Sequence, residues 1–508
     1  MNLQFAFQIL NRLVSKGVKT FCIAPSGRNA PFVEVLSHSD MEVFYFFDER
    51  AMAFFAHGRS KRDGLPVAVI TTSGTAVCEL LPAVVESYYS SSSLVLITAD
   101  RPSDYEGTAA PQCIEQTGMF SKYISKEWDL EAGYKEELNL SYWDTSSSIH
   151  INARFDEPLI DETAVYYQFL KSFQKNQYKA ELDTDRKIQF VDKNIFPQST
   201  RFIRDFFNTS THPVIVLSEL PLSLKNSVES FLLNLNRPVY AEPLSQLRES
   251  SKLKKLMLTE GMFHTALENN LIDGVIRIGA IPVFRFWRDL NNLRYPVLSF
   301  SLSSFSGLKK RRSAFPLELL FSHPEFFKPA KENLKIKALE KKPKGESAWI
   351  RWLSEKIPKK SHIFLGNSLP IREWSAWAVR EDKKFIYSAN RGANGIDGLI
   401  SSFLGSCLPD QPNYLILGDL SALYDLSSPW VLDQLKQYSV YIIVINNFGG
   451  NIFRNKFQNP HFLNHHHLNF SHFAKMWSLN YKCLKRFTDS FLSVPSPALI
   501  EIQIPQKS

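Results

Sequence analysis

Apolar residues along this chain gather in short, uninterrupted runs that are rich in β-branched side chains. Residues 414–417 (Tyr-Leu-Ile-Leu) and 441–445 (Tyr-Ile-Ile-Val-Ile) are two such runs, and neither alternates polar with apolar positions. Runs of this kind are typical of strands that are buried on both faces of a parallel sheet. Helix-length stretches separate the runs along the whole chain, so the pattern predicts an α/β fold of mainly parallel sheets flanked by helices.

The predicted strands fall into three groups. The first covers residues 20–24, 66–71, 94–98 and 150–153, and the second covers 213–217, 238–241, 274–278 and 296–300. The third covers 362–365, 385–388, 414–417, 441–445 and 498–502. A polar stretch at 171–194 and a basic stretch at 331–344 separate the groups. We therefore predict three domains, at residues 1–173, 190–332 and 345–508.

The composition of the 508 residues indicates an ordinary globular protein, with 44% hydrophobic and 22% charged residues. No apolar run approaches the roughly 18 residues of a membrane helix. The five cysteines are odd in number and far apart, which argues against a disulfide framework and a zinc site. The first residues resemble an amphipathic helix rather than a signal peptide. These features predict a cytoplasmic protein with no membrane partner.

The net charge of +8, from 59 basic and 51 acidic residues, fits either nucleic acid or small anionic substrates. Basic residues cluster at 309–312 and 341–344, but neither cluster is interleaved with the aromatic side chains that stack on single-stranded nucleic acid. We interpret both clusters as solvated loops and predict no nucleic-acid partner. Neither a Walker loop nor a GxGxxG motif follows any predicted strand.

Two turn motifs follow neighbouring apolar runs of the third group. Gly418-Asp419 comes after one run, and residues 446–449 (Asn-Asn-Phe-Gly) come after the next. Ligands on open α/β sheets bind beyond the carboxyl ends of strands, where both motifs would lie. A carboxylate from Asp419, an amide oxygen from Asn447 and the carbonyl of Gly449 suit the oxygen coordination of Mg²⁺ beside a diphosphate. Such residue pairs also occur in ordinary turns, which is the alternative.

A weak internal sequence similarity links the first and third groups. Residues 21–28 and 363–372 each contain a strand, a turn with serine and then an arginine. Two related domains of this kind would each supply half of a shared site.

Several strings of this sequence together carry a resemblance to a known family. They are Phe-Asp-Glu-Arg at 47–50, Thr-Ser-Gly-Thr-Ala at 72–76, Thr-Ala-Asp-Arg-Pro at 98–102, Gly-Asn-Ser at 366–368, Asn-Arg-Gly-Ala-Asn-Gly-Ile-Asp-Gly at 390–398 and Gly-Asp-Leu-Ser-Ala-Leu-Tyr-Asp-Leu at 418–426. With these strings the chain resembles the thiamine-diphosphate-dependent enzymes of the decarboxylase type, and among them the branch that serves menaquinone biosynthesis. The resemblance covers nearly the whole chain and is weakest in the second group.

The resemblance implies a three-domain thiamine-diphosphate-enzyme fold, with a pyrimidine-binding N-terminal domain, a central α/β domain and a C-terminal domain that binds diphosphate and metal. It implies decarboxylation of 2-oxoglutarate and addition of the succinyl-semialdehyde carbanion to isochorismate, with thiamine diphosphate and Mg²⁺ or Mn²⁺ as cofactors. It also implies a homodimer or homotetramer, since such enzymes build each site from two subunits. The alternatives are another carboligase, of the acetolactate-synthase type, and a non-catalytic homologue that binds the cofactor.

One catalytic acid is implied by the resemblance. Glu49 would hydrogen-bond the pyrimidine nitrogen of the cofactor, and burial should raise its pKa enough for a shared proton. A surface pair between Glu49 and Arg50 is the alternative. The residues implied to contact the cofactor are Glu49, Ser73, Gly74, Ile396, Gly418, Ser421, Ala422, Asn447 and Gly449, and those implied to bind the metal are Asp419, Asn447 and Gly449. Among them, Ile396 would support the folded conformation of the cofactor.

Both implied substrates are dicarboxylates, for which arginine offers charged and bidentate partners. The residues implied to contact them are Arg28, Arg101, Gln112, Arg285, Ser368, Arg372, Arg391, Ile452 and Phe453. Two positions depart from the family pattern, because Gly27 stands where a serine is expected and Pro111 where an asparagine is expected. Of the three adjacent histidines at 465–467, at most His466 is expected near the site.

Overall fold

The computed structural model of the chain describes residues 1–133, 138–160, 195–293, 295–309, 314–331, 336, 342–454, 456–488, 491 and 493–504. The predicted linker at 171–194 lies outside these residues. The same holds for the predicted domain boundaries at 173, 190 and 332, and for parts of the basic stretches at 309–312 and 331–344.

Two compact units make up the chain. The first combines Met1–Asp185 with Asn390–Pro409 and Ser421–Tyr438, and the second combines Arg186–Ala389 with Asp410–Leu420 and Ser439–Ser508. The third predicted domain therefore contributes residues to both units. Each of the three sheets nevertheless lies within one predicted domain, and the domain boundaries themselves stay predictions.

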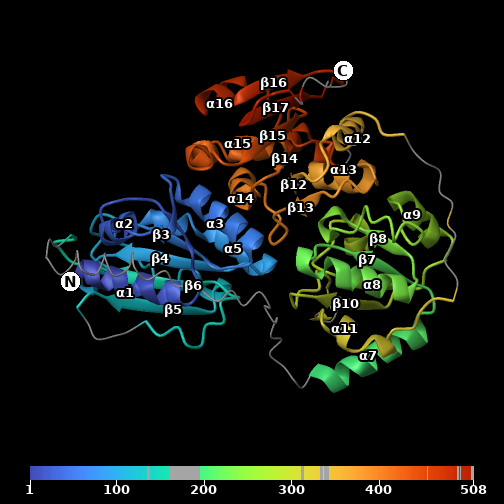
Figure 1. The fold of residues 1–508 in the computed structure, drawn as a ribbon, viewed down its shortest axis with the longest axis horizontal. Coiled ribbons are helices and arrows are strands. Elements are labelled where there is room, and N and C mark those ends of the chain that lie inside the picture. Colours follow the sequence, from blue (N-terminus) through green and yellow to red (C-terminus); the bar gives the residue numbers. More distant parts are fainter. Residues whose placement is uncertain are drawn as a thin grey trace. The chain divides into compact units, whose positions relative to one another are not determined.

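The N-terminal sheet has six parallel strands in the order β2-β1-β3-β4-β6-β5. They are β1 (Thr20–Ile23), β2 (Glu42–Tyr45), β3 (Val67–Thr71), β4 (Leu94–Asp100), β5 (Lys126–Glu131) and β6 (Ile149–Arg154). The sheet is flanked by the helices α1 (Asn2–Ser15), α2 (Ala30–Ser37), α3 (Glu49–Asp63) and α5 (Leu81–Ser90), as Figure 1 shows. The central strands β1, β3 and β4 are fully buried, which explains their uninterrupted apolar sequences.

The C-terminal sheet repeats the strand order of the N-terminal sheet. Its strands are β12 (His362–Leu365), β13 (Ile386–Ser388), β14 (Pro412–Gly418), β15 (Ser439–Asn446), β16 (Asn480–Leu484) and β17 (Ala498–Gln503). They pair in parallel in the order β13-β12-β14-β15-β17-β16, which is the N-terminal order strand for strand. The sequence similarity between residues 21–28 and 363–372 coincides with this repeat, because β1 and β12 occupy the same position in the two strand orders.

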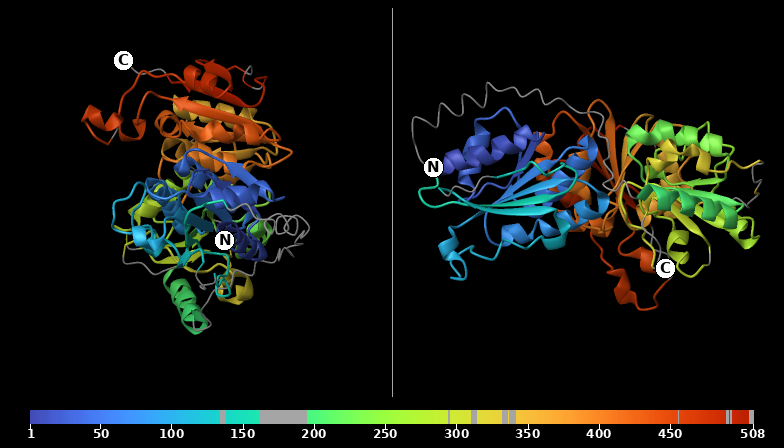
Figure 2. Two further views of the ribbon diagram at one scale, coloured as in Figure 1. Left: turned by 90° about the vertical axis from the view of Figure 1, so that its left-hand side faces the viewer. Right: turned by 90° about the horizontal axis from the view of Figure 1, so that it is seen from below.

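The central sheet has five parallel strands in the order β11-β10-β9-β7-β8. They are β7 (Pro213–Leu217), β8 (Val239–Ala241), β9 (Gly274–Ile278), β10 (Val297–Ser301) and β11 (Phe315–Pro316). The helices α8 (Lys225–Leu235) and α9 (Glu260–Glu268) flank this sheet, and the two further views of Figure 2 show its layered arrangement. The three parallel sheets confirm the predicted α/β class.

All of the predicted strands occur in the structure, while β2, β5, β11 and β16 were not predicted. Each of these four is an edge strand, and most of their residues are half-buried or exposed. An edge strand needs no continuous apolar run, so the hydrophobic pattern gives no signal for it. Within the described residues, no helix is both long and apolar enough to cross a membrane.

Candidate active site

The carboxylate of Asp419 lies at the carboxyl end of a central strand. β14 and β15 pair with Gly418 opposite Ile445, so Asp419 and Asn447 follow the ends of adjacent strands. Asp419 is 2% exposed, and its Oδ2 accepts a hydrogen bond from the amide of Gly449 over 2.9 Å. Burial raises the pKa of Asp419, although main-chain amides act in the opposite direction. The structure thus brings Asp419 and Gly449, two of the predicted metal ligands, into direct contact.

In the side-chain amide of Asn447, the nitrogen has a hydrogen-bond partner and the oxygen has none among the described residues. Its Nδ2 donates to Oε2 of Glu346, the first residue of α12 (Glu346–Lys356), over 3.0 Å. Its Oδ1 is buried and has no hydrogen-bond partner among the residues that the structure describes. A buried amide oxygen without a partner is costly unless a cation or a donor binds it. This oxygen is therefore suited to bind a ligand.

Gly449 lies in a tight part of the following loop. Its φ of 142° lies in the region that favours glycine, and a Cβ there would collide with the carbonyl oxygen of Leu463. The amide of Gly450 donates to the same carbonyl over 2.6 Å. Farther along this loop, Nε2 of His466 lies 3.3 Å from Oδ2 of Asp419. Of the three adjacent histidines, His466 is thus placed beside the predicted metal ligands, as expected.

The donor set at this strand end is made of oxygens of different kinds. Asp419 offers a carboxylate, Asn447 an amide oxygen and Gly449 a main-chain carbonyl. In the described part of the chain, no group of three or more His, Cys, Asp or Glu residues is arranged to hold a metal ion. Hard oxygen donors of mixed type, which leave positions for water and phosphate, fit Mg²⁺ or Mn²⁺ better than Zn²⁺ or copper, which prefer nitrogen and sulfur ligands.

Glu49 is the first residue of α3, and Asp48 caps that helix by accepting a hydrogen bond from the amide of Ala51 over 2.9 Å. The Glu49 side chain is half-buried. Burial raises its pKa, and the carboxylates of Asp48 and Glu79 add to the rise by repulsion. The direction of this shift agrees with the expectation for a proton-sharing acid.

Arg50 has a different partner from the one that the alternative interpretation requires. Its guanidinium pairs with Oδ1 of Asp425 over 3.4 Å and donates to the carbonyl of Tyr424 over 2.9 Å. Asp425 is buried and also accepts hydrogen bonds from the amides of Gly398 and Ile400, at 2.8 and 2.9 Å. Burial raises the pKa of Asp425 to about 6. Asp425 therefore fixes the end of the 390–398 string, where α14 (Leu399–Ser406) begins.

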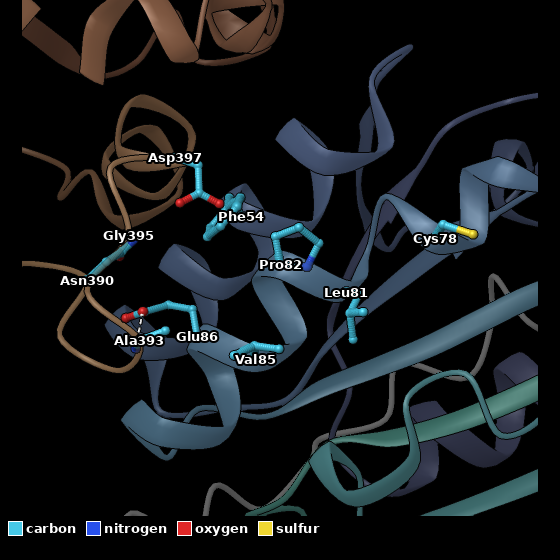
Figure 3. Close-up of a pocket in the computed structure, with 10 residues that line it drawn as sticks. All are labelled: Phe54, Cys78, Leu81, Pro82, Val85, Glu86, Asn390, Ala393, Gly395 and Asp397. Carbon is cyan, nitrogen blue, oxygen red and sulfur yellow. Dashed lines mark hydrogen bonds between the residues drawn. The ribbon is translucent and has the colours of Figure 1, made fainter. Parts of the chain in front are cut away.

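A cavity of about 410 Å³ lies between this string and the N-terminal helices α3, α4 (Thr75–Cys78) and α5. It is lined by Phe54, Cys78, Leu81, Pro82, Val85, Glu86, Asn390, Ala393, Gly395 and Asp397. In Figure 3 the Glu86 carboxylate of α5 points towards the loop that carries the last four, and Phe54 of α3 lies near that loop, whereas Leu81 lies farther from it. Ile396, the predicted support of the cofactor, lies between two of the lining residues and is 36% exposed. The cavity is therefore bordered by the loop that carries this predicted contact.

The turn at Ser73 and Gly74 follows β3 and rests on a buried polar network. The amide of Gly74 donates to Oε1 of Gln116 over 3.0 Å, and Nε2 of Gln116 donates to Oδ1 of Asn152 over 2.8 Å. Nδ2 of Asn152 in turn donates to Oδ2 of Asp100 over 3.1 Å. The network therefore joins the predicted cofactor turn to the end of β4, where Arg101 follows Asp100.

Two predicted substrate arginines of the first unit contact the chain itself. Arg28 donates to the carbonyl of Phe155 over 3.0 Å and pairs with Glu157 at 3.5 Å. Arg101 donates through Nε and Nη2 to the carbonyl of Pro111, both at 3.1 Å. Pro111 stands where the family pattern has an asparagine. Its main-chain oxygen accepts both hydrogen bonds from Arg101. Gln112, the next residue, is exposed.

The predicted substrate residues of the second unit gather near a group of cations. The main-chain oxygen of Ser368 accepts a hydrogen bond from Nη1 of Arg372 over 2.7 Å. Slight desolvation lowers the pKa of Lys456, which is exposed, and repulsion from Arg372, Arg288 and Arg285 lowers it further. Lys456 and Arg288 were not predicted, and their charges lie close enough to the predicted arginines to interact with them.

The other predicted residues occupy more varied surroundings. Arg285, on α10 (Arg285–Asp289), is exposed and pairs with Asp289 at 3.7 Å. Ile452 is half-buried, and Phe453 packs against Phe457 with ring centroids 5.8 Å apart. Gly418 ends β14, Ser421 and Ala422 are buried in α15 (Asp419–Tyr424), and Arg391 is half-buried at the start of the 390–398 string.

The predicted site residues form two sets. The first unit holds Arg28, Glu49, Ser73, Gly74, Arg101, Gln112, Arg391, Ile396, Ser421 and Ala422, and the second holds Arg285, Ser368, Arg372, Gly418, Asp419, Asn447, Gly449, Ile452 and Phe453. Besides Arg288 and Lys456, three residues next to them were missed: Glu86, Gln116 and Glu346. Glu86 gives a sequence signal, because it is a single charge in the apolar stretch 81–86, whereas the other two give none.

Comparison with known proteins places the chain among its relatives. Residues 3–119 match the family described as "Thiamine pyrophosphate enzyme, N-terminal TPP binding domain". The chain is 39% identical to the 2-succinyl-5-enolpyruvyl-6-hydroxy-3-cyclohexene-1-carboxylate synthase of Bdellovibrio bacteriovorus, covering 94% of this chain and 91% of the relative. It is 34% identical to the synthase of the same name from Akkermansia muciniphila, covering 89% of this chain and 84% of the relative.

The fold has a counterpart among solved structures. A crystal structure of a provisionally assigned thiamin diphosphate-dependent enzyme from Mycobacterium smegmatis superposes with a TM-score of 0.71 at 14% identity and covers 99% of both chains. At that identity the likeness shows the fold alone. The relatives at 39% and 34% identity, which match over nearly the full length, show the family. The chain therefore belongs to the family of 2-succinyl-5-enolpyruvyl-6-hydroxy-3-cyclohexene-1-carboxylate synthases.

Proposed function

We propose that this chain decarboxylates 2-oxoglutarate and joins the remaining four-carbon fragment to isochorismate. The products are 2-succinyl-5-enolpyruvyl-6-hydroxy-3-cyclohexene-1-carboxylate and CO₂, and the reaction belongs to menaquinone or phylloquinone biosynthesis. The observation that carries this proposal is the 39% identity with a synthase of that name over nearly the whole of both chains.

Thiamine diphosphate is the cofactor of this reaction, and when bound it supplies the electron sink for decarboxylation and carbon–carbon bond formation. Asp419, Asn447 and Gly449 would hold Mg²⁺ or Mn²⁺ beside the diphosphate. The open, buried Oδ1 of Asn447 supports this assignment, since a cation would satisfy it. Gly418, Ser421, Ala422, Ser73 and Gly74 complete the cofactor contacts that we propose.

Glu49 holds a proton for the cofactor. Its raised pKa favours a proton on its carboxylate, which Glu49 would share with a ring nitrogen of the bound cofactor. The position of Glu49 at the start of α3, with Asp48 capping the helix, fixes the direction in which the side chain leaves the backbone. Ile396 supports the cofactor from the 390–398 string.

The arginines bind and orient the two dicarboxylate substrates. A buried carboxylate needs charged partners, and a guanidinium offers two parallel donors. We assign this role to Arg28, Arg101, Arg285, Arg372 and Arg391, with Gln112 and Ser368 as polar contacts and Ile452 and Phe453 as the apolar wall. The cations around Lys456 support the assignment, because a dense positive field favours an anionic substrate.

The active protein is a homodimer, or a homotetramer built from such dimers. An exposed apolar patch on the first unit supports this assembly, because Phe47, Tyr424, Leu426 and Trp430 are all exposed. The rings of Phe47 and Trp430 meet edge to face with centroids 5.0 Å apart, and the guanidinium of Arg50 lies 4.9 Å from the ring centroid of Tyr424.

We also propose that the enzyme is cytoplasmic and that its three domains span residues 1–173, 190–332 and 345–508.

A product assay tests the proposed function. The purified chain is incubated with thiamine diphosphate, Mg²⁺, 2-oxoglutarate and isochorismate, and the adduct is identified by mass spectrometry. We expect the adduct to form only when all four components are present. Turnover of pyruvate in place of 2-oxoglutarate would favour an acetolactate-synthase-type carboligase. Cofactor binding without any turnover would favour a non-catalytic homologue.

A further inference from the structure

The carboxylate of Glu86 is bound by three consecutive main-chain amides of the 390–398 string. Glu86 belongs to α5 and is 3% exposed. Its Oε1 accepts from the amide of Gly392 over 2.6 Å, and its Oε2 accepts from the amides of Ala393 and Asn394 over 2.7 and 3.3 Å. Figure 3 shows this carboxylate facing Ala393 at one end of the cavity. The loop is therefore held by the carboxylate of one buried side chain.

The fit between helix and loop leaves no room for a larger residue at the contact. A Cβ on Gly392 would collide with the main-chain oxygen of Glu86, so glycine allows the loop to reach the helix. Burial raises the pKa of Glu86, while the three amides and Lys61 favour its charged form. Hydrogen bonds to an ionised carboxylate are stronger than neutral ones, so the contact is well suited to hold a loop in one conformation.

The loop that Glu86 holds carries two residues of the proposed site. Arg391 precedes the three bound amides and Ile396 follows them, while Asp425 fixes the far end of the string through the amide of Gly398. Between these two anchors the string also forms one wall of the cavity. We propose that Glu86 is a positioning residue, which holds the 391–396 loop in the conformation that aims Arg391 at a substrate carboxylate and Ile396 at the cofactor. The part of this proposal that concerns ligands rests on the proposed function.

Replacement of Glu86 by glutamine tests the contact directly. Glutamine keeps the size of the side chain, but it exchanges one acceptor oxygen for an NH₂ group that would face an amide donor. We expect the amides of residues 392–394 to exchange hydrogen with deuterated solvent about tenfold faster in Glu86→Gln, as the loss of a charge-assisted bond predicts. Glu34→Gln is the matched control, since Glu34 lies on helix α2 of the same unit and faces His38 at 3.8 Å.

Steady-state kinetics separate a positioning role from a merely structural one. We expect the apparent KM for isochorismate to rise about tenfold in Glu86→Gln, with a smaller change in kcat. Glu86→Asp keeps the charge on a shorter side chain, should restore part of the affinity, and replaces the glutamine variant if that one does not fold. Unchanged exchange at 392–394 would overturn the contact, and faster exchange with unchanged KM and kcat would overturn the positioning role. If the parent chain does not turn over isochorismate, the proposed function fails, while the exchange experiment still decides the contact.

Discussion

Asn447 donates a hydrogen bond from Nδ2 to Oε2 of Glu346 over 3.0 Å, although the two residues lie on different elements. This bond fixes which end of the amide is the oxygen, and it leaves the buried Oδ1 open. Mutation of a group that orients a metal ligand commonly lowers metal affinity by roughly 10–100-fold. Glu346 is therefore expected to control metal binding without being a ligand.

Glu346→Ala should weaken Mg²⁺ binding by about tenfold, because the Asn447 amide would be free to rotate. Isothermal titration of the protein with Mg²⁺ in the presence of thiamine diphosphate measures this change. Glu355→Ala, on the same helix, is the control, since Glu355 pairs with Arg351 at 2.7 Å on an exposed face. Equal Mg²⁺ affinity in both variants would mean that Glu346 does not orient the ligand.

Glu49→Gln should lower kcat by roughly 10²–10⁴, the usual range for loss of a group that transfers a proton. The reason is that glutamine cannot share a proton with the ring nitrogen, although it keeps the size of the side chain. Initial rates of adduct formation at saturating cofactor measure the effect, and the exposed Glu268→Gln in α9 serves as the control. A Glu49→Gln enzyme with full turnover would refute the role of Glu49.

Arg372→Ala and Arg391→Ala should each raise the apparent KM for at least one of the two acids by about tenfold or more. The loss of one charge-assisted hydrogen bond to a carboxylate accounts for a change of this size. Separate titrations of 2-oxoglutarate and isochorismate show which acid each arginine binds. Arg351→Ala, on the exposed face of α12, should leave both values unchanged. If both KM values also stay unchanged in the two test variants, these arginines lie outside the substrate pocket.

Stability should depend on pH through His57, which is buried in α3 with its Nδ1 2.8 Å from Oγ of Ser92. Burial lowers the pKa of His57 to about 3, and Lys61 adds to the shift. The unfolded chain binds this proton near pH 6.5 and the folded chain does not, so the folded state loses stability as pH falls from about 6.5 towards 3.

His57→Gln should therefore flatten the loss of stability in acid. Relative to the variant, the parent chain should lose about 2 kcal/mol more between pH 7 and pH 5, from linkage of this single group. Thermal melting at the two pH values measures the difference, and His461→Gln, at an exposed position, should behave like the parent. Identical acid sensitivity in parent and His57→Gln would contradict a neutral, buried His57.

The hydrophobic pattern predicted all of the buried central strands and missed four of the edge strands. Strands such as β3 and β15 are continuous apolar runs because they are buried on both faces, and the sequence records that burial directly. The edge strands β5 and β16 are half-exposed, so their side chains need not be apolar. Strand order follows from tertiary packing, and apart from the weak likeness of residues 21–28 and 363–372 no local pattern shows that the N-terminal and C-terminal sheets share one topology.

The sequence predicted that the two strand-end motifs lie side by side, while the roles of their residues stay predictions. Asp419 and Asn447 follow apolar runs, and the strands alone place them together. Glu86, Gln116 and Glu346 act on groups far away in the sequence, and their partners are mostly main-chain amides or another side chain's amide. Such contacts leave no spacing rule in the sequence, so only the folded chain shows them.

The fate of individual carbon atoms tests the central claim most directly. The chain is incubated with thiamine diphosphate, Mg²⁺, isochorismate and 2-oxoglutarate labelled with ¹³C at either the first or the second carbon. We expect the first label to leave entirely as CO₂ and the second to appear entirely in the isochorismate adduct, in equal amounts. Release of labelled CO₂ without transfer of the second label to isochorismate, or no release at all, would contradict the proposed function.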